Sequence, residues 1–328
     1  MGQVTDSDNM EKLYDRTDAK IKDPVVDVIL STYQHEDYIR HALDSVLSQK
    51  TSYPFRIIAG DDCSPDRTGD IILEYQKKHP DMITSVIWRK NSFSMGLRNA
   101  YELIKMSNAR YIATIEGDDY WTDDRKLEKQ VSFLENNPEY SACVHNVKCV
   151  DEEETFFHKD YNVYPFRPEH IYTQRDALGL KLVSQLSSFL FKNFYLDWNE
   201  EDWSMYENCR AHGDIIRTVY LGMTGRIFFM DDFMSGYRRE HKGVSYSGSN
   251  SAEKKLWLQY FDKQEVYYYV YNRFGVPADI MNAWNDTWLK CKINLALKPN
   301  PENLGNMLKM IRSRIELKRF ERIHGDGK

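Results

Sequence analysis

The stretch Tyr111-Ile-Ala-Thr-Ile-Glu-Gly-Asp-Asp-Tyr-Trp121 leads an apolar run directly into a group of acidic residues. A continuous apolar run is typical of a strand that is buried on both faces of a parallel sheet. In open α/β sheets, ligands bind just beyond the carboxyl ends of such strands. Adjacent carboxylates such as Asp118 and Asp119 repel each other there, and a neutralising cation is the main way to tolerate them. For an isolated pair of acids, a solvated acidic turn would be the favoured interpretation, and a second site of the same design upstream is what overturns it.

Strands and helices alternate on both sides of this stretch. Apolar runs predict strands at residues 25–33, 55–59, 83–88, 111–115 and 140–150. Apolar residues repeated every three or four positions predict helices at residues 35–49, 67–79, 96–106 and 123–136. Such alternation implies right-handed βαβ crossovers, so we expect an α/β fold with a mainly parallel sheet flanked by helices.

The regular alternation ends near residue 151. Beyond it, the sequence predicts a strand at 186–191, a helix at 214–221, a short strand at 227–230, a flexible loop at 236–251 and helices from residue 252 onward. We therefore expect a mobile or loosely docked leader at 1–23, one domain at 24–250 and a helical C-terminal region at 251–328.

The composition narrows the class of protein. The chain has 328 residues and a net charge of −6, which argues against a nucleic-acid partner. Its five cysteines form no C-x-x-C pair, which argues against a zinc site or a disulfide framework and fits a reducing compartment. No apolar run reaches the length of about 18 residues that spans a membrane, and the first residues do not resemble a signal peptide. These features predict a cytoplasmic protein.

Two further strand ends carry polar side chains. The predicted strand at 55–59 is followed by Asp61 and Asp62, and the predicted strand at 25–33 ends in Ser31, Thr32 and Tyr33. All three ends should lie on one edge of the sheet. A nucleoside diphosphate on a cation would suit that edge, because carboxylates accept base and ribose protons and bind the cation, and an aromatic ring stacks on the base.

Four motifs, in this order, resemble family 2 glycosyltransferases with the GT-A fold, which build bacterial capsule, lipopolysaccharide and teichoic acid polymers. They are residues 28–49, residues 57–68 with Asp-Asp-Cys-Ser-Pro-Asp-Arg-Thr, residues 95–100 with Gly-Leu-Arg-Asn, and residues 116–121 with Glu-Gly-Asp-Asp-Tyr-Trp. The resemblance covers residues 25–247. It implies a Rossmann-like nucleotide-diphospho-sugar transferase domain, with a nucleotide-binding half at 24–150 and an acceptor half at 151–250.

The resemblance implies a role for each residue of the expected donor site. Asp62 would hold the nucleobase, flanked by Ser31 and Tyr33, with Thr32 and Asp61 beside them. Arg98 would lie near the ribose or the diphosphate, and Asp118 near the ribose or the sugar. Asp119 would bind Mn²⁺ or Mg²⁺, while Glu116 takes the first place of the family's Asp-x-Asp motif. Asp61 and Ser64 also fit N-terminal capping of the next helix.

Two later segments resemble the family's acceptor region. By the match of residues 212–222, Asp214 would be the catalytic base, although Gly213 stands where the family more often has Glu. A first-turn acid that favours the helix dipole is the simpler alternative for Asp214. By the match of residues 234–245, Arg238 and His241 would close over the diphosphate, and His241 would complete the metal shell. An ordinary basic surface loop is the alternative for that pair.

The tail at residues 304–328 combines one apolar helical stripe with basic residues. A basic amphipathic helix lies on anionic membranes, which would suit a polyprenyl-linked acceptor. Docking on its own domain or on a second subunit in a homo-oligomer fits the pattern as well.

The implied reaction is the transfer of a sugar, with inversion, from a UDP- or dTDP-linked donor to an acceptor hydroxyl on a saccharide or a polyprenyl-linked glycan. A sugar-phosphate nucleotidyltransferase is one alternative, but it should carry a Gly-rich basic loop after its first strand. Residues 31–37 contain no Gly, Lys or Arg. The other alternative is a non-catalytic scaffold that keeps the fold. The sugar, the acceptor and the linkage stay open at this point.

Overall fold

A computed structural model describes residues 13–95, 97–151, 154–155, 171–173, 176–177, 183–208, 213–238, 273–274, 301, 303–309, 311–312 and 315. His241, most of the expected loop at 236–251 and most of the region from residue 252 onward lie outside these residues. Contacts divide the chain into two compact units. The first comprises Met1–Thr173, Leu182–Asn199 and Thr224–Gly243, and the second comprises Gln174–Lys181, Glu200–Met223 and Val244–Lys328. The domain boundaries expected at residues 24, 151 and 251 stay predictions.

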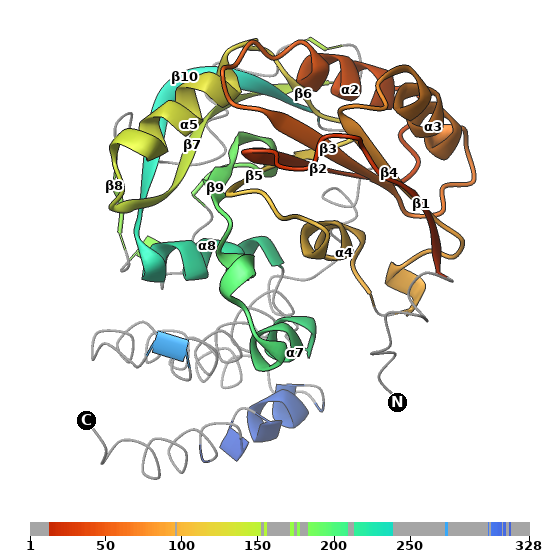
Figure 1. Cartoon of the computed structure of the whole chain (residues 1–328). Coiled ribbons are helices and arrows are strands. Elements are labelled where there is room, and N and C mark those ends of the chain that lie inside the picture. The colour runs from red at the N-terminus through yellow and green to blue at the C-terminus, as the bar shows by residue number, and fades with distance from the viewer. Residues whose placement is uncertain are drawn as a thin grey trace. The chain divides into compact units, whose positions relative to one another are not determined.

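The first unit is built on a sheet that has ten strands among the described residues, in the order β1-β4-β3-β2-β5-β9-β7-β10-β6, with β8 paired to β10 (Figure 1). The strands are β1 (Tyr14–Thr17), β2 (Val26–Thr32), β3 (Phe55–Asp61), β4 (Ile83–Trp88), β5 (Tyr111–Glu116), β6 (Tyr120–Trp121), β7 (Tyr140–Val150), β8 (Ile171–Tyr172), β9 (Leu190–Lys192) and β10 (Arg226–Arg238). Strands β4, β3, β2 and β5 are parallel neighbours. The predicted α/β class with a mainly parallel core is therefore confirmed.

Helices cover both faces of this sheet. They are α2 (Ile39–Leu47), α3 (Thr68–Lys78), α4 (Asn99–Lys105) and α5 (Lys126–Asn136). Figure 1 shows α2, α3 and α5 on one face and α4 on the other. On the first face, alternate β2 residues Val26, Val28 and Leu30 join one fully buried cluster with the inward residues of the three helices. The period of two in β2 and of three to four in the helices produces this layering.

The leader prediction is wrong for residues 14–17. They form β1, which pairs antiparallel with β4, and the ring of Tyr14 lies edge-on to Trp88 at 5.2 Å. Without β1, strand β4 would present unpaired backbone groups at the edge of the sheet. Docking the leader there satisfies those groups.

The predicted loop at 236–251 is wrong at its start. Residues 236–238 belong to β10, which extends from Arg226 to Arg238 and pairs with both β7 and β6. A side chain at Gly236 would place its Cβ 2.5 Å from Cζ of Tyr120, so the glycine leaves room for the Tyr120 ring of the neighbouring strand. Glycine here marks a close approach within a sheet rather than a flexible loop.

The expected strand at 186–191 is also shorter than predicted. Residues Leu186–Ser188 form a 3-10 turn, η2, and only Leu190–Lys192 form a strand, β9. The side-chain oxygen of Gln185 accepts a hydrogen bond from the backbone N–H of Ser187 at 2.6 Å, which folds the turn.

A buried ion pair fixes the amino ends of β2 and β3. The Arg56 guanidinium donates two parallel hydrogen bonds of 2.8 Å to the carboxylate of Asp27, which has no solvent exposure. Ser107 Oγ donates a third bond to the same carboxylate at 2.7 Å. Because its oxygens are well supplied with donors, the buried charge of Asp27 is compensated.

The second unit is described in part. It contains α7 (Glu200–Asn208), α8 (Gly213–Thr224) and helical residues between 301 and 315. Within it, Arg273 Nε lies 3.1 Å from the Asp202 carboxylate, and the ring of Phe274 packs edge-on against Tyr220 at 5.1 Å. In the part of the chain that the structure describes, every helix is too short or too polar to cross a lipid bilayer.

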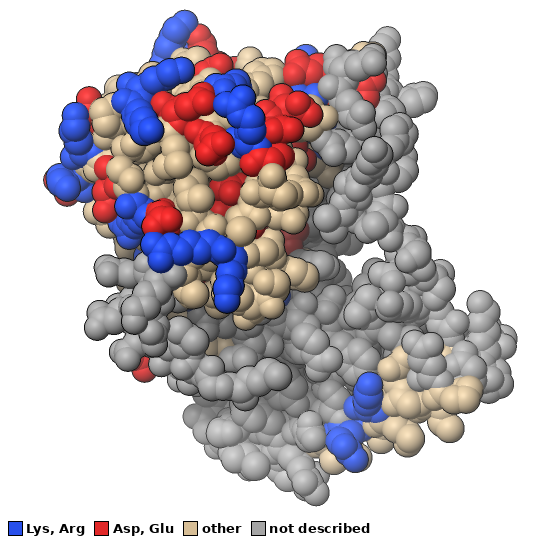
Figure 2. Space-filling view, turned by 90° about the vertical axis from the view of Figure 1, so that its right-hand side faces the viewer, with Lys and Arg blue, Asp and Glu red and all other residues tan. Residues whose placement is uncertain are grey.

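Charged side chains of both signs are interspersed on the described surface that faces the viewer in Figure 2. Elsewhere among the described residues, ion pairs such as Arg40–Glu74 and Lys129–Asp232 join such side chains. The expectation that no nucleic acid binds stays a prediction.

Candidate active site

Three strand ends meet at one edge of the sheet, as the sequence predicts. Ser31 of β2 is in register with Gly60 of β3 and with Glu116 of β5, and Thr32 is in register with Asp61. All three strands run in the same direction, so their carboxyl ends deliver their polar residues to this edge. We call it the acidic edge.

Asp61 folds the turn that follows β3. Its carboxylate is buried and accepts hydrogen bonds from the backbone N–H of Ser64 at 3.0 Å and from Ser64 Oγ. Cys63 within this turn has a positive φ of 60°. Burial raises the pKa of Asp61 above its usual value, and the hydrogen bonds from Ser64, which lower that pKa, offset only part of the shift. The capping interpretation is wrong for Asp61 and Ser64, because α3 begins four residues after Ser64 and these bonds close the turn itself.

Asp62 is held from the other side by the loop after β4. One carboxylate oxygen accepts a hydrogen bond from the backbone N–H of Ser92 at 2.5 Å, and the other accepts one from Asn91 Nδ2 at 3.1 Å. A carboxylate has about four acceptor positions, so Asp62 keeps capacity for a further donor such as the imide N–H of a base. The sequence reasoning missed Asn91 and Ser92, which set the orientation of Asp62.

Three buried polar atoms, on two side chains packed against Gly117 and on the residue that follows it, have no hydrogen-bond partners among the described residues. They are Thr32 Oγ1, His35 Nδ1 and Asp118 Oδ1. A Cβ added at Gly117 would lie 2.6 Å from Thr32 Oγ1 and 2.9 Å from His35 Nδ1, which places both side chains against this residue. His35 Nε2 lies 3.9 Å from Asp118 Oδ2, so His35 faces the acidic pair. Buried polar groups are normally paired, so an unpaired group of this kind calls for a ligand or ordered water.

The two acids of the central motif have different surroundings. Asp119 is 1% exposed, and its two oxygens accept hydrogen bonds from Gln185 Nε2 at 2.7 Å and from the backbone N–H of Arg238 at 3.0 Å. Burial, followed by the charges of Asp118 and Glu116, raises the pKa of Asp119 well above its usual value. Asp118 keeps one carboxylate oxygen that no described group bonds. The sequence reasoning missed Gln185, which precedes η2 and is distant from Asp119 in the chain.

Arg238 is a buried structural cation in this structure. Its guanidinium donates to the backbone oxygens of Asp118 at 3.0 Å and Asp151 at 3.1 Å, and to Glu154 Oε1 at 2.9 Å. It also lies over the ring of Tyr38, 4.4 Å from its centroid. Arg238 therefore stabilises the turn that carries Asp118 and Asp119, through its backbone N–H as well as its guanidinium. Its expected contact with a diphosphate stays a prediction.

The other predicted donor residues occupy different positions. Tyr33 is 43% exposed at the end of β2, with its ring available for stacking. Arg98 stands at the start of α4, where its guanidinium donates to Tyr101 Oη at 2.9 Å and lies over the Tyr101 ring. The Ser31 backbone oxygen accepts a hydrogen bond from the N–H of Gly117 at 3.0 Å. The roles of these residues toward a donor stay predictions.

Asp214 belongs to the second unit and is described there by itself. It lies in the first turn of α8, and its Oδ1 accepts a hydrogen bond from the N–H of Ile215 at 3.0 Å. A first-turn acid is favoured by the helix dipole, as expected for the simpler interpretation of this residue. One bonded oxygen leaves the other free of hydrogen bonds from the described residues, so the position also suits a proton acceptor.

The acidic edge suits a cation that is shared with a ligand. No group of three or more His, Cys, Asp or Glu side chains is arranged around a common point within the described residues. Mg²⁺ in phosphate-binding sites is held by one or two carboxylates plus phosphate oxygens and water. The unbonded oxygen of Asp118 fits such an open site, whereas both Asp119 oxygens already accept hydrogen bonds. His241, predicted to complete the shell, lies outside the described residues.

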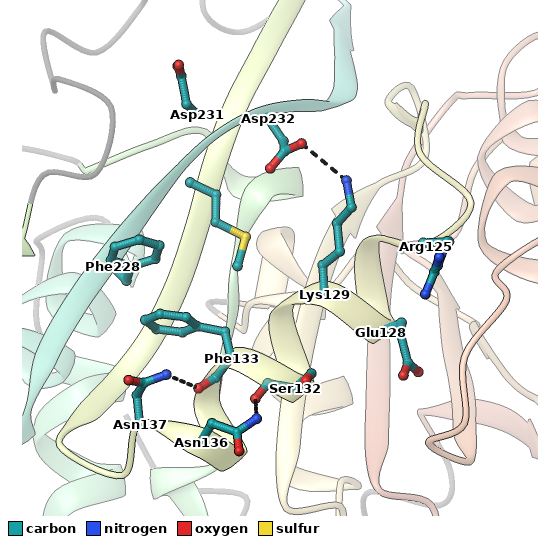
Figure 3. Close-up of a pocket in the computed structure, with 11 residues that line it drawn as sticks. Arg125, Glu128, Lys129, Ser132, Phe133, Asn136, Asn137, Phe228, Asp231 and Asp232 are labelled. Carbon is teal, nitrogen blue, oxygen red and sulfur yellow. Dashed lines mark hydrogen bonds and ion pairs between the residues drawn. The ribbon is translucent and has the colours of Figure 1, made fainter.

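A separate cavity of about 640 Å³ opens between α5 and β10 (Figure 3). Phe133 stacks on Phe228 there with ring centroids 4.3 Å apart, and Lys129 reaches across to Asp232 at 3.1 Å. None of its lining residues belongs to the acidic edge or to the predicted site. We therefore place the candidate active site at the acidic edge, on the strength of its chemistry.

The sequence matches a known protein family. The family model described as Glycosyl transferase family 2 matches residues 27–196. The chain belongs to glycosyl transferase family 2. This match contains β2, β3 and β5 with the acidic edge between them, so the resemblance found in the sequence is confirmed.

Relatives of this family 2 glycosyltransferase extend the comparison. It is 29% identical over 240 residues to the uncharacterized protein Rv1520 of Mycobacterium tuberculosis, which covers 70% of this chain and 63% of that protein. The chain thus spans less than two thirds of the length of that relative. It is also 29% identical over 250 residues to the putative teichuronic acid biosynthesis glycosyltransferase TuaG of Bacillus subtilis, covering 75% of this chain and 90% of TuaG.

Solved structures agree on the fold. The crystal structure of Staphylococcus aureus TarS residues 1–349 superposes with a TM-score of 0.60 at 18% identity, over 88% of this chain and 79% of that chain. The same TarS segment in complex with UDP-GlcNAc gives a TM-score of 0.61 at 17% identity, over 87% and 79% of the two chains. At such identity the likeness bears on the fold alone, and it confirms the predicted GT-A fold.

Proposed function

We propose that this chain is an inverting glycosyltransferase that moves a sugar from a UDP- or dTDP-linked donor to an acceptor hydroxyl during synthesis of a cell-surface polysaccharide or glycolipid. The observation that carries the proposal is the group of three unpaired buried polar atoms around Gly117, at the edge where β2, β3 and β5 end. Family membership and the similarity to TuaG, a putative teichuronic acid biosynthesis glycosyltransferase, support the reaction class. The complex of TarS with UDP-GlcNAc supports a nucleotide-sugar donor.

The donor would lie along the acidic edge. Asp62 would accept the imide N–H of uracil or thymine, because its orientation is fixed by Ser92 and Asn91 while acceptor capacity remains. The exposed ring of Tyr33 would stack on the base. Thr32 Oγ1 and His35 Nδ1 would then gain partners on the ribose or the diphosphate, which relieves the cost of burying them unpaired.

Asp118 would offer an oxygen to Mn²⁺ or Mg²⁺, and Asp119 would fix the turn that presents it. This assignment rests on the hydrogen bonds of the two carboxylates. Both oxygens of Asp119 accept hydrogen bonds, whereas Oδ1 of Asp118 accepts none from the described residues. The sequence favours Asp119 as the ligand, and variants of both residues distinguish the two assignments. When bound, a divalent cation neutralises charge that develops on the departing diphosphate.

In the proposed reaction, the acceptor oxygen attacks the anomeric carbon on the face opposite the diphosphate. The new C–O bond forms as the bond to the diphosphate oxygen breaks, which inverts the configuration. Asp214 would take the acceptor proton, since its second oxygen accepts no hydrogen bond from the described residues. The departing nucleoside diphosphate leaves with the bonding electron pair.

Calorimetric titration with UDP, dTDP, GDP and CDP, each with and without Mn²⁺, tests the donor site directly. We expect one or both of UDP and dTDP to bind, and to bind more tightly with Mn²⁺. If none binds to the folded protein, the acidic edge is not a donor site and the non-catalytic scaffold becomes the better explanation.

Asp214→Asn tests the base. It should leave nucleotide affinity unchanged and lower sugar transfer by about 10²–10⁴-fold, the usual contribution of general base catalysis. Asp70→Asn is the matched control, because Asp70 is an exposed acid in the first turn of α3. Unchanged transfer by Asp214→Asn would remove Asp214 as the base without affecting the donor-site proposal.

A further inference from the structure

An apolar stripe faces solvent on the last described helix. Leu304, Leu308, Ile311 and Ile315 follow one another at intervals of four, three and four residues, all in helical conformation. Their exposed fractions are 56%, 60%, 39% and 51%. Residues three and four apart share one face of a helix. Four large aliphatic side chains on one exposed face form a coherent patch, which we call the C-terminal stripe.

Basic residues accompany this stripe. Lys309 and Arg312 are exposed on the described helix. In the sequence from 304 to 322 there are six Lys or Arg residues and two Glu residues, whereas the whole chain carries a net charge of −6. The positive charge is therefore concentrated where the exposed apolar side chains are. This excess of positive charge complements an anionic surface.

The spacing of the basic residues places one of them at the border of the stripe. Arg312 follows Leu308 by four residues and Ile311 by one, so it stands at the border of the stripe. Long basic side chains at such a border can extend toward a negatively charged surface while their methylene stems lie along apolar groups. Leu and Ile side chains on one face with Lys and Arg around them are the pattern of helices that lie in the interface of an anionic membrane.

We infer that the C-terminal stripe docks this protein on the surface of an anionic lipid bilayer. The apolar side chains would enter the boundary between headgroups and acyl chains, and Lys309 and Arg312 would contact the anionic headgroups. The inference rests on the stripe and its charge and does not depend on the proposed glycosyltransferase reaction. If both hold, the bilayer would bring the enzyme to an acceptor whose lipid moiety is embedded in the same membrane.

Flotation of the full chain with lipid vesicles tests the docking. We expect binding to vesicles of phosphatidylglycerol and phosphatidylcholine, little binding to vesicles of phosphatidylcholine alone, and weaker binding as the salt concentration rises. Absence of binding to the anionic vesicles would overturn the inference.

Two variants locate the contact. Leu304→Ser combined with Leu308→Ser should lower the bound fraction about tenfold or more, because interfacial binding scales with buried apolar area. Leu196→Ser is the matched control, since Leu196 is also a leucine with a 56% exposed fraction but belongs to the other unit. Lys309→Glu combined with Arg312→Glu should abolish the preference for anionic vesicles. Wild-type binding by either double variant would refute the inference.

A second copy of the chain is the competing occupant of the stripe. Sedimentation velocity without lipid distinguishes a bilayer from a second copy. If a second copy covers the stripe, the stripe variants would dissociate an oligomer that Leu196→Ser leaves intact. That outcome would overturn lipid docking. Circular dichroism and melting temperatures like those of the unaltered protein, as expected for exposed positions, show that loss of binding is not loss of folding.

Discussion

Asparagine substitutions at Asp118 and Asp119 should affect different properties: Asp119→Asn should lower stability, and Asp118→Asn should weaken metal-dependent nucleotide binding. In Asp119→Asn, one of the two oxygens becomes an NH₂ group that faces Gln185 Nε2 or the N–H of Arg238, both donors. Losing one charge-assisted hydrogen bond and leaving a buried donor unpaired costs about 3–5 kcal/mol. Removal of a buried charge offsets part of it, so we expect a net loss of about 2 kcal/mol.

Asp118→Asn should scarcely change stability. Its Oδ1 has no partner among the described residues, and removing its charge relieves repulsion with Asp119. The same change should weaken nucleotide binding in Mn²⁺ by about tenfold or more, because a neutral amide is a poorer ligand for a hard cation than a carboxylate. Without metal, its nucleotide affinity should equal that of the unaltered protein.

Differential scanning fluorimetry and calorimetry measure both effects on the same samples. About 2 kcal/mol corresponds to a fall in Tm of about 4–8 °C for a domain of this size. The reasoning is refuted if Asp119→Asn melts normally and loses Mn²⁺-dependent binding while Asp118→Asn keeps it. Asp119 would then be the cation ligand, as the sequence alone suggests.

Other predictions concern the fold around this edge. Asp27→Ala should lower the free energy of unfolding by about 3–5 kcal/mol in urea titrations, because it leaves the buried guanidinium of Arg56 unpaired; a loss below 1 kcal/mol contradicts this. Gly117→Ala places a Cβ 2.6 Å from Thr32 Oγ1, so nucleotide affinity should fall about tenfold by calorimetry, within the usual cost of overpacking; unchanged affinity argues against binding there. Burial lowers the pKa of Lys126 to about 7. Because the unfolded chain holds that proton up to about pH 10.4, the stability that Lys126 contributes should rise from pH 7 upward, and Lys126→Met should flatten the rise in urea midpoint; equal slopes in both proteins refute it.

The sequence allows the strands of the acidic edge to be predicted because their signals are local. Apolar runs mark β2, β3 and β5, and the register of Ser31 with Gly60 and Glu116 follows from parallel pairing. The family motifs lie at these same strand ends, so the edge and its acids are visible without coordinates. Even the limits of β4 and β7 agree with the apolar runs that predict them.

The partners of those acids could not be read from the sequence because their contacts are distant along the chain. Gln185 bonds to Asp119 across 66 residues, and the N–H of Arg238 does so across 119. Ser92 reaches Asp62 across 30 residues. No periodicity or motif links such positions, since a side-chain amide or a backbone N–H has no signature of its own. The position of His35 beside Gly117 could not be predicted from the sequence either, because the apolar pattern that follows His35 predicts only the start of a helix.

The docking of β1 on β4 has a practical consequence for self-association. A chain shortened to begin at residue 24, the domain boundary expected from the sequence, would lack the four residues that pair with Ser85–Trp88. Strand β4 would then offer a free row of backbone N–H and C=O groups, which is a template for pairing with the same strand of another molecule. Such a shortened protein would be expected to dimerise or precipitate through this edge. β1 is itself an edge strand, but with four residues, and with Asp15 and Arg16 exposed, it offers a shorter and more polar edge than β4 does, which disfavours pairing between copies of the protein.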